Sequence, residues 1–304
     1  MLSLILPSLL ALAQGAPHGH PKGNSTGLNA GLVSDLAVAK AFAAHITGPS
    51  NVTANWTAAG DDLSLWDGFF LETNPDTNQL ALASVDINGF GLEGDYQLEG
   101  FLDKLHDLAL FHANSNNFKG TIPKINKLKY LYELDVSNNK LSGSFPKNAL
   151  GVNGLTFFDI RFNSFSGKLP SDLFTTWPQI EAIFVNNNEF EGEIPNSIGA
   201  FPGQYLALAN NKLSGAIPTT VANMASLQEF LLLGNQLTGT IPQGLGNLVN
   251  LTVFDASHNQ LTGPVPEDLC ASKSVQNITL EGNNLDKNLG PNCAQALKKG
   301  VLTI

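Results

Sequence analysis

The sequence predicts an α/β repeat solenoid, a right-handed horseshoe whose concave side is a parallel sheet of about nine strands behind an N-terminal helical cap. Three observations favour this fold. The pattern LxxLxLxxNxLxGxIP recurs along the chain, with steps of 23, 24, 25, 23, 24, 24 and 24 residues between its fixed asparagines. The xLxLx part of each copy alternates as a short strand does. A chain of 304 residues, 43% of them hydrophobic, also has enough apolar side chains for an extended core.

The beginning of the chain indicates secretion. Residues 1–15 read as a signal peptide, because an apolar run from Leu2 to Leu12 is followed by small residues and is too short to span a bilayer. Residues 16–31 are expected to be a flexible polar segment. We find no second apolar run that could form a transmembrane segment.

Residues 32–79 are predicted to form the N-terminal cap. The segment LVSDLAVAKAFAAHIT, at residues 32–47, reads as a short amphipathic helix. Four aromatic side chains follow and are expected to hold the cap together by packing: Trp56, Trp66, Phe69 and Phe70.

Residues 80–287 contain the repeats. Alternation along one strand should place Leu134 and Val136 in the core and Asp135 in solvent. The fixed asparagine of each copy should turn inward, where its amide can bond backbone groups that would otherwise be buried without partners. These asparagines would form a ladder of Asn116, Asn139, Asn163, Asn188, Asn211, Asn235, Asn259 and Asn283. The Gly-x-Ile-Pro tails are expected to bend the chain and end its regular hydrogen bonding.

The repeats resemble a known family. The spacing lies within the range of leucine-rich repeats, and the Gly-x-Ile-Pro ending is similar to their plant-specific class. HANSNNFKGTIP, ELDVSNNKLSGSFP, FFDIRFNSFSGKLP and TVFDASHNQLTGPVPEDLC, in this order, resemble the repeat domain of the leucine-rich-repeat extensins over roughly residues 33 to 293. The resemblance implies a cell-wall protein that binds secreted cysteine-rich peptides. Related plant repeat proteins inhibit fungal polygalacturonases.

The chain departs from that family in two places. Ser64 and Leu71 stand where the family has a cysteine pair in the cap. The sequence ends at Ile304 without a Ser-Pro-rich extensin tail, so we expect no covalent anchoring through such a module.

The two cysteines, Cys270 and Cys293, are predicted to form one disulfide. They flank the last repeat and match the pair that the family has there, so the bond would close the C-terminal end of the stack. Residues 288–304 then form the C-terminal cap and tail.

Five Asn-x-Ser/Thr sequons are candidate glycosylation sites. They are Asn24, Asn51, Asn55, Asn250 and Asn277. A glycan on Asn277 would block one end of the concave face, so ligand contact should centre on the middle repeats.

The candidate ligand-binding residues lie on the strand positions that should face solvent. They are His112, Tyr132, Glu133, Asp135, Phe157, Asp159, Arg161, Phe184 and Tyr205. Aromatic side chains supply contact area and carboxylates attract cations, so this face is suited to a cationic peptide or protein. Arg161, the single arginine of the chain, could pair with Asp159 or bind a carboxylate of the partner.

These features predict a secreted, non-catalytic scaffold that binds an extracellular peptide or protein through its concave face, and the resemblance implies a basic, cysteine-rich partner. Two alternatives remain: a binder or inhibitor of a wall-degrading glycoside hydrolase such as polygalacturonase, and a passive structural glycoprotein of the wall. The net charge of −10 argues against nucleic acid as a partner. The sequence offers no metal ligand cluster, no evident cofactor motif and no supported catalytic group, so an enzyme is not predicted.

Overall fold

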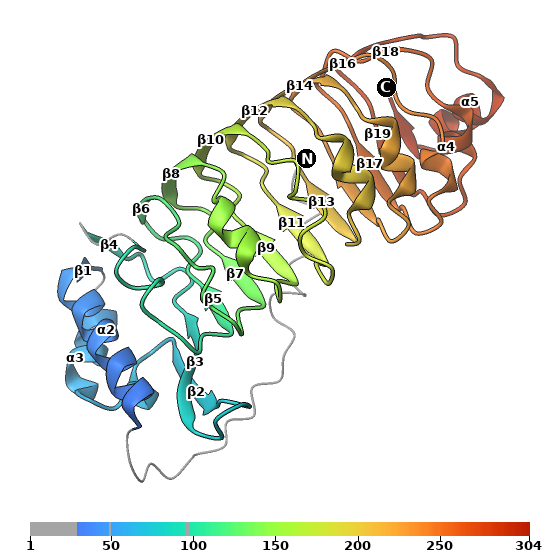
Figure 1. Cartoon of the computed structure of the whole chain (residues 1–304). Helices are drawn as coiled ribbons and strands as arrows, with labels where there is room; N and C mark the ends of the chain where they lie inside the picture. The colour runs from blue at the N-terminus through green and yellow to red at the C-terminus, as the bar shows by residue number, and fades with distance from the viewer. Residues whose placement is uncertain (1–28, 49, 95–97) are drawn as a thin grey trace.

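The computed structural model describes residues 29–48, 50–94 and 98–304 of the chain (Figure 1). The predicted signal peptide, nearly all of the predicted polar segment and the Asn24 sequon lie outside these residues, as does the side chain of Asn51.

A long sheet of eleven strands runs the length of the described repeats. Nine of its strands belong to successive repeats and are parallel, as the sequence predicts: β3 (Leu80–Asp86), β5 (Leu110–His112), β7 (Glu133–Asp135), β9 (Phe157–Asp159), β11 (Ala182–Phe184), β13 (Tyr205–Ala207), β15 (Glu229–Leu231), β17 (Val253–Asp255) and β19 (Asn277–Thr279). The antiparallel strand β2 (Phe69–Thr73) extends the sheet at one end, and β21 (Leu302–Thr303) extends it at the other.

A second sheet lies across the solenoid from the first, along the upper edge of Figure 1, and the sequence analysis did not predict it. It contains β6 (Lys119–Gly120), β8 (Lys140–Ser144), β10 (Ser164–Lys168), β12 (Glu189–Glu193), β14 (Lys212–Ala216) and β16 (Gln236–Thr238), and β18 (Thr262–Gly263) pairs separately with β20 (Asn284–Leu285). The expectation that the tail ends regular hydrogen bonding is wrong for four tails, because β8, β10, β12 and β14 continue through the glycine, whereas β16 ends before Gly239. In Gly143, for example, φ is 98°, a left-handed value that glycine adopts without steric cost.

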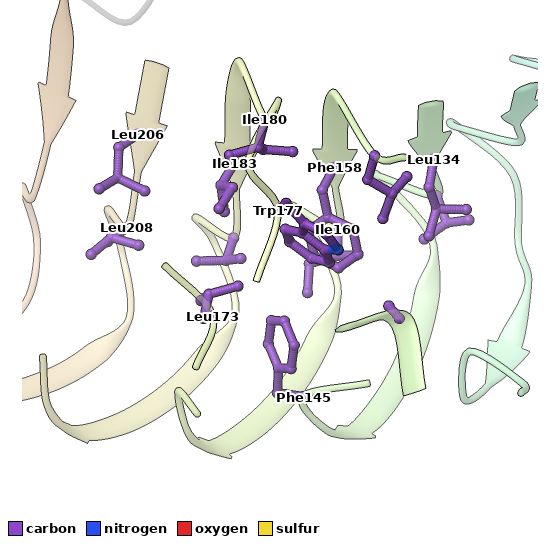
Figure 2. Close-up of a cluster of buried hydrophobic side chains, with 14 of the residues drawn as sticks. Leu134, Phe145, Phe158, Ile160, Leu173, Trp177, Ile180, Ile183, Leu206 and Leu208 are labelled. Atoms are coloured by element: carbon purple, nitrogen blue, oxygen red, sulfur yellow. The ribbon is translucent and has the colours of Figure 1, made fainter. Parts of the chain in front are cut away.

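The core fills the space between the two sheets. The middle residue of each repeat strand points into it, as Leu134, Phe158 and Ile183 do in Figure 2. Short 3-10 helices complete several repeats: η2 (Lys147–Gly151), η3 (Asn196–Ala200), η4 (Thr219–Asn223) and η5 (Leu245–Asn247). Each repeat thus buries its apolar side chains against the next repeat, which is how a solenoid is stabilised.

The fixed asparagines form a continuous hydrogen-bonded ladder. In all eight, Nδ2 donates to backbone carbonyls of its own repeat and of the preceding one, while Oδ1 accepts a backbone N–H of the preceding repeat. Five of them are buried and three half-buried. The ladder therefore links every repeat to its neighbour through otherwise unpaired backbone groups.

The N-terminal cap is built from helix α2 (Ala30–His45), helix α3 (Ser50–Ala59) and the short helix η1 (Leu63–Leu65). Helix α2 begins two residues before the predicted segment because the side chain of Asn29 accepts a hydrogen bond from the backbone N–H of Leu32. Strand β1 (Ile46–Thr47) then pairs with β4 (Glu93–Gly94) and ties the cap to the first repeat.

Aromatic packing holds the cap together. The rings of Trp56 and Trp66 are stacked with their centroids 5.7 Å apart, and Phe69 meets both edge-on. All three side chains are buried, whereas Phe70 is half-buried. Ser64, at one of the positions where the related family has a cysteine, is exposed and donates a hydrogen bond from Oγ to Asp62.

The C-terminal end is closed by helix α4 (Glu267–Ala271) and helix α5 (Pro291–Lys298), which the Cys270–Cys293 disulfide joins. The carboxylate of Glu267 accepts the backbone N–H groups of Asn292 and Cys293 in the first turn of α5. The predicted disulfide is therefore present. Glu267 adds a second link between the two helices, since its negative charge lies at the positive N-terminal end of α5.

Candidate ligand-binding face

The parallel register brings the candidate residues into two columns on the side of the long sheet that faces away from the core. We call this surface the long-sheet face and define it by Ser84 and Asp86 of β3 and the first and third residues of β5 to β19, together with Tyr132 and Arg161 beside the strand ends. The first residues include Glu133, Phe157 and Tyr205, and the third residues include His112, Asp135, Asp159 and Phe184. Tyr132 directly precedes β7, and Arg161 lies two residues beyond β9.

The candidates at the third position of their strands were expected to face solvent, and this expectation is wrong. His112, Asp135, Asp159 and Phe184 are all buried, with exposed fractions of 5%, 4%, 0% and 3%. Adjacent strands lie only about 4.8 Å apart, so long side chains in neighbouring strands cover one another. Phe184, for example, lies edge-on to Phe157 at 5.6 Å between ring centroids.

The aspartates of this column serve the backbone. Oδ1 of Asp135 accepts the backbone N–H of Ser137, and Oδ1 of Asp159 accepts that of Arg161, each at 2.9 Å. Asp255 accepts the N–H of Ser257 in the same way. These two-residue contacts turn the chain out of each strand, a role that Asp favours and that the sequence analysis did not recognise.

Arg161 pairs within the molecule rather than standing free. Its Nε lies 3.0 Å from Oδ2 of Asp159, without the alignment of a hydrogen bond, and its guanidinium lies over the ring of Phe184 at 5.2 Å. Burial raises the pKa of Asp159 well above its usual value, and the charge of Asp135 adds to this effect, although Arg161 partly opposes it. Of the two interpretations of Arg161, the structure contains the internal ion pair.

His112 is surrounded by carboxylates. Burial lowers its pKa, but contact with Glu133 and the charges of Asp135, Glu133 and Asp86 outweigh burial and raise the pKa above its ordinary value. Nε2 of His112 lies 3.0 Å from Oε2 of Glu133. Both cationic candidates on this face are thus already matched with acids.

Two tyrosines on the long-sheet face each lie near two glutamates. Burial raises the pKa of the Tyr205 hydroxyl, and the charges of Glu229 and Glu181 raise it further. For Tyr132 the same effect comes from burial and then from Glu133 and Glu72. Three of these acids are not among the candidate ligand-binding residues predicted from the sequence: Glu72, Glu181 and Glu229. The repeat register places Glu229 on this face and could have revealed Glu181, whereas Glu72 belongs to β2, which lies outside the repeats.

An apolar cluster separate from the main core occupies the middle of this face. Ala182, Phe184 and Ala207 form it, and Phe157, Tyr205 and Leu231 pack against it half-buried. The centre of the face is therefore apolar, with the tyrosine–glutamate groups beside it.

The sequons fall in different surroundings. Asn250 is exposed just before β17, whereas Asn277 is half-buried in β19 on the long-sheet face, where its Oδ1 accepts a hydrogen bond from Thr279. Asn55 is half-buried in α3, and its Oδ1 accepts the backbone N–H of Asp67. Of the described sequons, Asn250 is the most open.

Within residues 29–48, 50–94 and 98–304, no group of three or more His, Cys, Asp or Glu side chains is arranged to hold a metal ion. Over the same residues, no helix is long and apolar enough to cross a membrane.

Comparison with known proteins places these features in a family. The Leucine Rich Repeat family model matches residues 130–150, 226–248 and 250–272, three of the copies seen in the fold. The fold is a leucine-rich repeat solenoid, and the chain resembles plant proteins of that type. It is similar to leucine-rich repeat extensin-like protein 4 of Arabidopsis thaliana, with 38% identity over 188 residues, or 61% of this chain and 37% of the relative. Extensin-like protein 2 of the same plant is 40% identical over 178 residues, or 58% of this chain and 22% of the relative. The leucine-rich repeat protein thus spans less than two-fifths of the length of these relatives.

Solved structures share the fold. The complex of PEPR1 with AtPEP1 superposes with a TM-score of 0.72 at 29% identity, covering 85% of this leucine-rich repeat protein and 36% of that chain. The plant peptide hormone receptor RGFR1 in complex with RGF2 superposes with a TM-score of 0.55 at 33% identity, covering 60% of this chain and 29% of that chain. A plant ice-binding protein gives 0.65 at 25% identity, covering 83% and 87%. The findings support a protein-binding scaffold.

Proposed function

We propose that this leucine-rich repeat protein binds a cationic peptide or protein through the long-sheet face, in the extracellular space or cell wall, without catalysis. The observation that carries the proposal is the pair of tyrosines with glutamates beside them. Tyr132 lies near Glu133 and Glu72, and Tyr205 lies near Glu229 and Glu181.

The charge balance of the face favours a cation. His112 and Arg161 are the cationic side chains on the described part of the face, and each contacts a carboxylate of the protein itself. Glu72, Glu181 and Glu229 are paired with neither of these cations, so they leave negative charge for a partner. A lysine or arginine between an aromatic ring and a carboxylate gains contact area and charge attraction together.

Relatives and a structural neighbour support the location and the class of partner. The extensin-like proteins favour an extracellular or wall location, and one of the structural neighbours is a plant peptide hormone receptor in complex with RGF2. A basic, cysteine-rich partner is the member of this class that the resemblance to the extensins favours.

The test is crosslinking of the tagged full chain to native extracellular material, followed by identification and charge analysis of what is captured. We expect a basic peptide or protein whose capture falls at least about tenfold in the double variant Glu181→Gln/Glu229→Gln, because two charge contacts with the partner are lost. The matched control is Glu191→Gln/Glu193→Gln, which makes the same change on β12 in the second sheet, where both side chains are exposed.

Equal capture by the two double variants would reject the long-sheet face as the binding surface. Captured partners that are acidic or neutral would reject the proposed chemistry.

A further inference from the structure

Phe162 occupies a backbone position that suits a phenylalanine poorly. In each of the eight repeats with a ladder asparagine, the residue before that asparagine has a left-handed conformation. These residues are Ser115, Asn138, Phe162, Asn187, Asn210, Gly234, His258 and Gly282, with φ between 51° and 73°. In seven of the eight the N–H at this position bonds to a carbonyl of the next repeat, as Phe162 does to Asn186 at 3.1 Å, so the stack holds this conformation.

Most side chains at this position suit it. Glycine has no side-chain clash there, and Asn tolerates the left-handed region better than other residues. A bulky residue incurs a steric cost there, because its Cβ lies too close to the following carbonyl oxygen. The ring of Phe162 does not recover this cost by full burial, since the residue is 46% exposed. A strained and exposed aromatic side chain indicates a role outside folding.

The neighbours of Phe162 form an uncharged row. We name it the rim row and define it as Ser115, Asn138, Phe162, Asn187 and Asn210. On each side of Phe162 along the row, two polar side chains are hydrogen-bonded to each other. Nδ2 of Asn138 donates to Oγ of Ser115 at 2.9 Å, and Nδ2 of Asn210 donates to Oδ1 of Asn187 at 3.0 Å. With a spacing of about 4.8 Å between strands, the row is roughly 19 Å long.

The chemistry of the rim row differs from that of the long-sheet face beside it. Each amide has two donors and a carbonyl with two lone pairs, so hydrogen-bonding capacity remains on both sides of the ring after these contacts. The row has no charge to attract or repel an ion. A pyranose ring matches such a surface, because it has an apolar face that stacks on an aromatic ring and hydroxyls around its edge that both donate and accept. An apolar peptide side chain would instead need apolar neighbours, and the side chains that flank Phe162 in the row are amides.

From these observations we infer that the rim row binds a neutral glycan chain, with Phe162 stacked on one sugar ring and Asn138 and Asn187 bonded to hydroxyls on either side. The site is separate from the acidic surface proposed for the cationic partner. It would hold the protein on neutral polysaccharide while the long-sheet face stays available.

The test is affinity electrophoresis of the purified full chain through native gels that contain xyloglucan, mixed-linkage β-glucan or galactomannan, with polygalacturonate as the acidic comparison. We expect retardation by at least one neutral polysaccharide. Phe162→Gly should weaken it about fivefold to tenfold, the size of one aromatic contact. Phe162→Trp should retain it. The thermal midpoint of Phe162→Gly should equal or exceed that of the unaltered protein, since glycine relieves the backbone strain.

Val249→Ala is the control, because it shortens a side chain that is 77% exposed outside the row and should change neither readout. No retardation by any neutral polysaccharide would overturn the inference, as would retardation by polygalacturonate alone or full retention by Phe162→Gly. A Phe162→Gly variant with a midpoint several degrees lower would show the ring to be structural. Loss of the captured peptide partner in this variant, without glycan binding, would assign Phe162 to the peptide site and reject the glycan.

Discussion

At the scale of single residues, the fixed asparagine and the aspartate that precedes it by four positions show what a sequence reveals. The inward turn of the asparagines follows from their repetition, because eight polar side chains at fixed spacing in an apolar pattern need buried partners. The burial of Asp159 does not follow from alternation, which gives only the side of the strand. Neighbouring side chains, such as Arg161 above Phe184, decide how much water reaches that side.

Asn163→Ala tests the ladder. The Nδ2 of Asn163 donates to the carbonyls of Val136, Ile160 and Arg161, and its Oδ1 accepts the N–H of Leu141. Alanine leaves these groups unpaired, so we expect the free energy of unfolding to fall by about 1 to 3 kcal/mol in denaturant titrations. Ser164→Ala, at the exposed neighbouring position, should change it by less than about 0.5 kcal/mol. Equal stability of the two variants would contradict the ladder.

At the scale of elements, the periodic pattern of hydrophobic residues predicts the repeat strands and the cap helix. It does not predict the second sheet. Segments such as Lys140–Ser144 carry glycine and end before proline, which normally indicates a turn. They pair because the stack places the same segment of the next repeat beside them, a contact that a single copy does not encode. Helix α2 likewise buries Asp35, whose spacing from Leu32 and Leu36 puts it on the apolar face although its charge would favour solvent.

Asp35 should make the cap sensitive to pH. Burial raises the pKa of Asp35 to about 7, with a further contribution from the charge of Asp107 and a partial offset from the backbone of Leu82. Because this pKa lies above the unfolded value of about 3.9, the stability that the protonated carboxyl contributes is complete below about pH 4 and is lost as pH rises to about 7.

The free energy of unfolding of Asp35→Asn should therefore exceed that of the unaltered protein by about 1 to 3 kcal/mol at pH 7.5. At pH 4 the two free energies should be close. Denaturant titrations across this range measure the difference. Glu99→Gln, a neutralisation at an exposed site, should show no such trend. A difference for Asp35→Asn that is constant with pH would refute the assignment.

The C-terminal disulfide should stabilise the end of the stack. It joins residues separated by 23 positions, and constraint of a loop of this size in the unfolded chain contributes about 3 kcal/mol. We expect Cys270→Ala/Cys293→Ala to lower the free energy of unfolding by about that amount. Reductant should lower the free energy of unfolding of the unaltered protein and leave that of the double variant unchanged. An equal decrease in both proteins would contradict a stabilising role of the disulfide.

At the scale of the whole molecule, stacking converts a one-dimensional pattern into an extended acidic and aromatic surface. The sequence was sufficient for the fold and the parallel register, while the choice of binding surface stays a prediction. It did not separate the acids that bond their own backbone, such as Asp135, from those beside tyrosines, such as Glu229, because both lie on the same side of the sheet. The net charge of −10 gives the surface a long-range attraction for cations.

Salt dependence follows from that charge. Capture of the cationic partner should weaken as ionic strength rises from about 0.05 to 0.5 M, because the screening length falls from about 14 to about 4 Å over that interval. Surface plasmon resonance with the captured partner would measure this weakening, and we expect it mainly as a slower association rate at high salt. Association that is independent of salt would argue for recognition by apolar contacts alone.

The most direct test of the central claim is site-specific photo-crosslinking of the captured partner, with benzoyl-phenylalanine placed at position 157, 205 or 166 in otherwise unaltered chains. Positions 157 and 205 lie on the long-sheet face, and position 166 is an exposed site in β10 of the second sheet. The account predicts covalent adducts with a basic partner from positions 157 and 205 and none from position 166. Adducts from position 166 alone would contradict it.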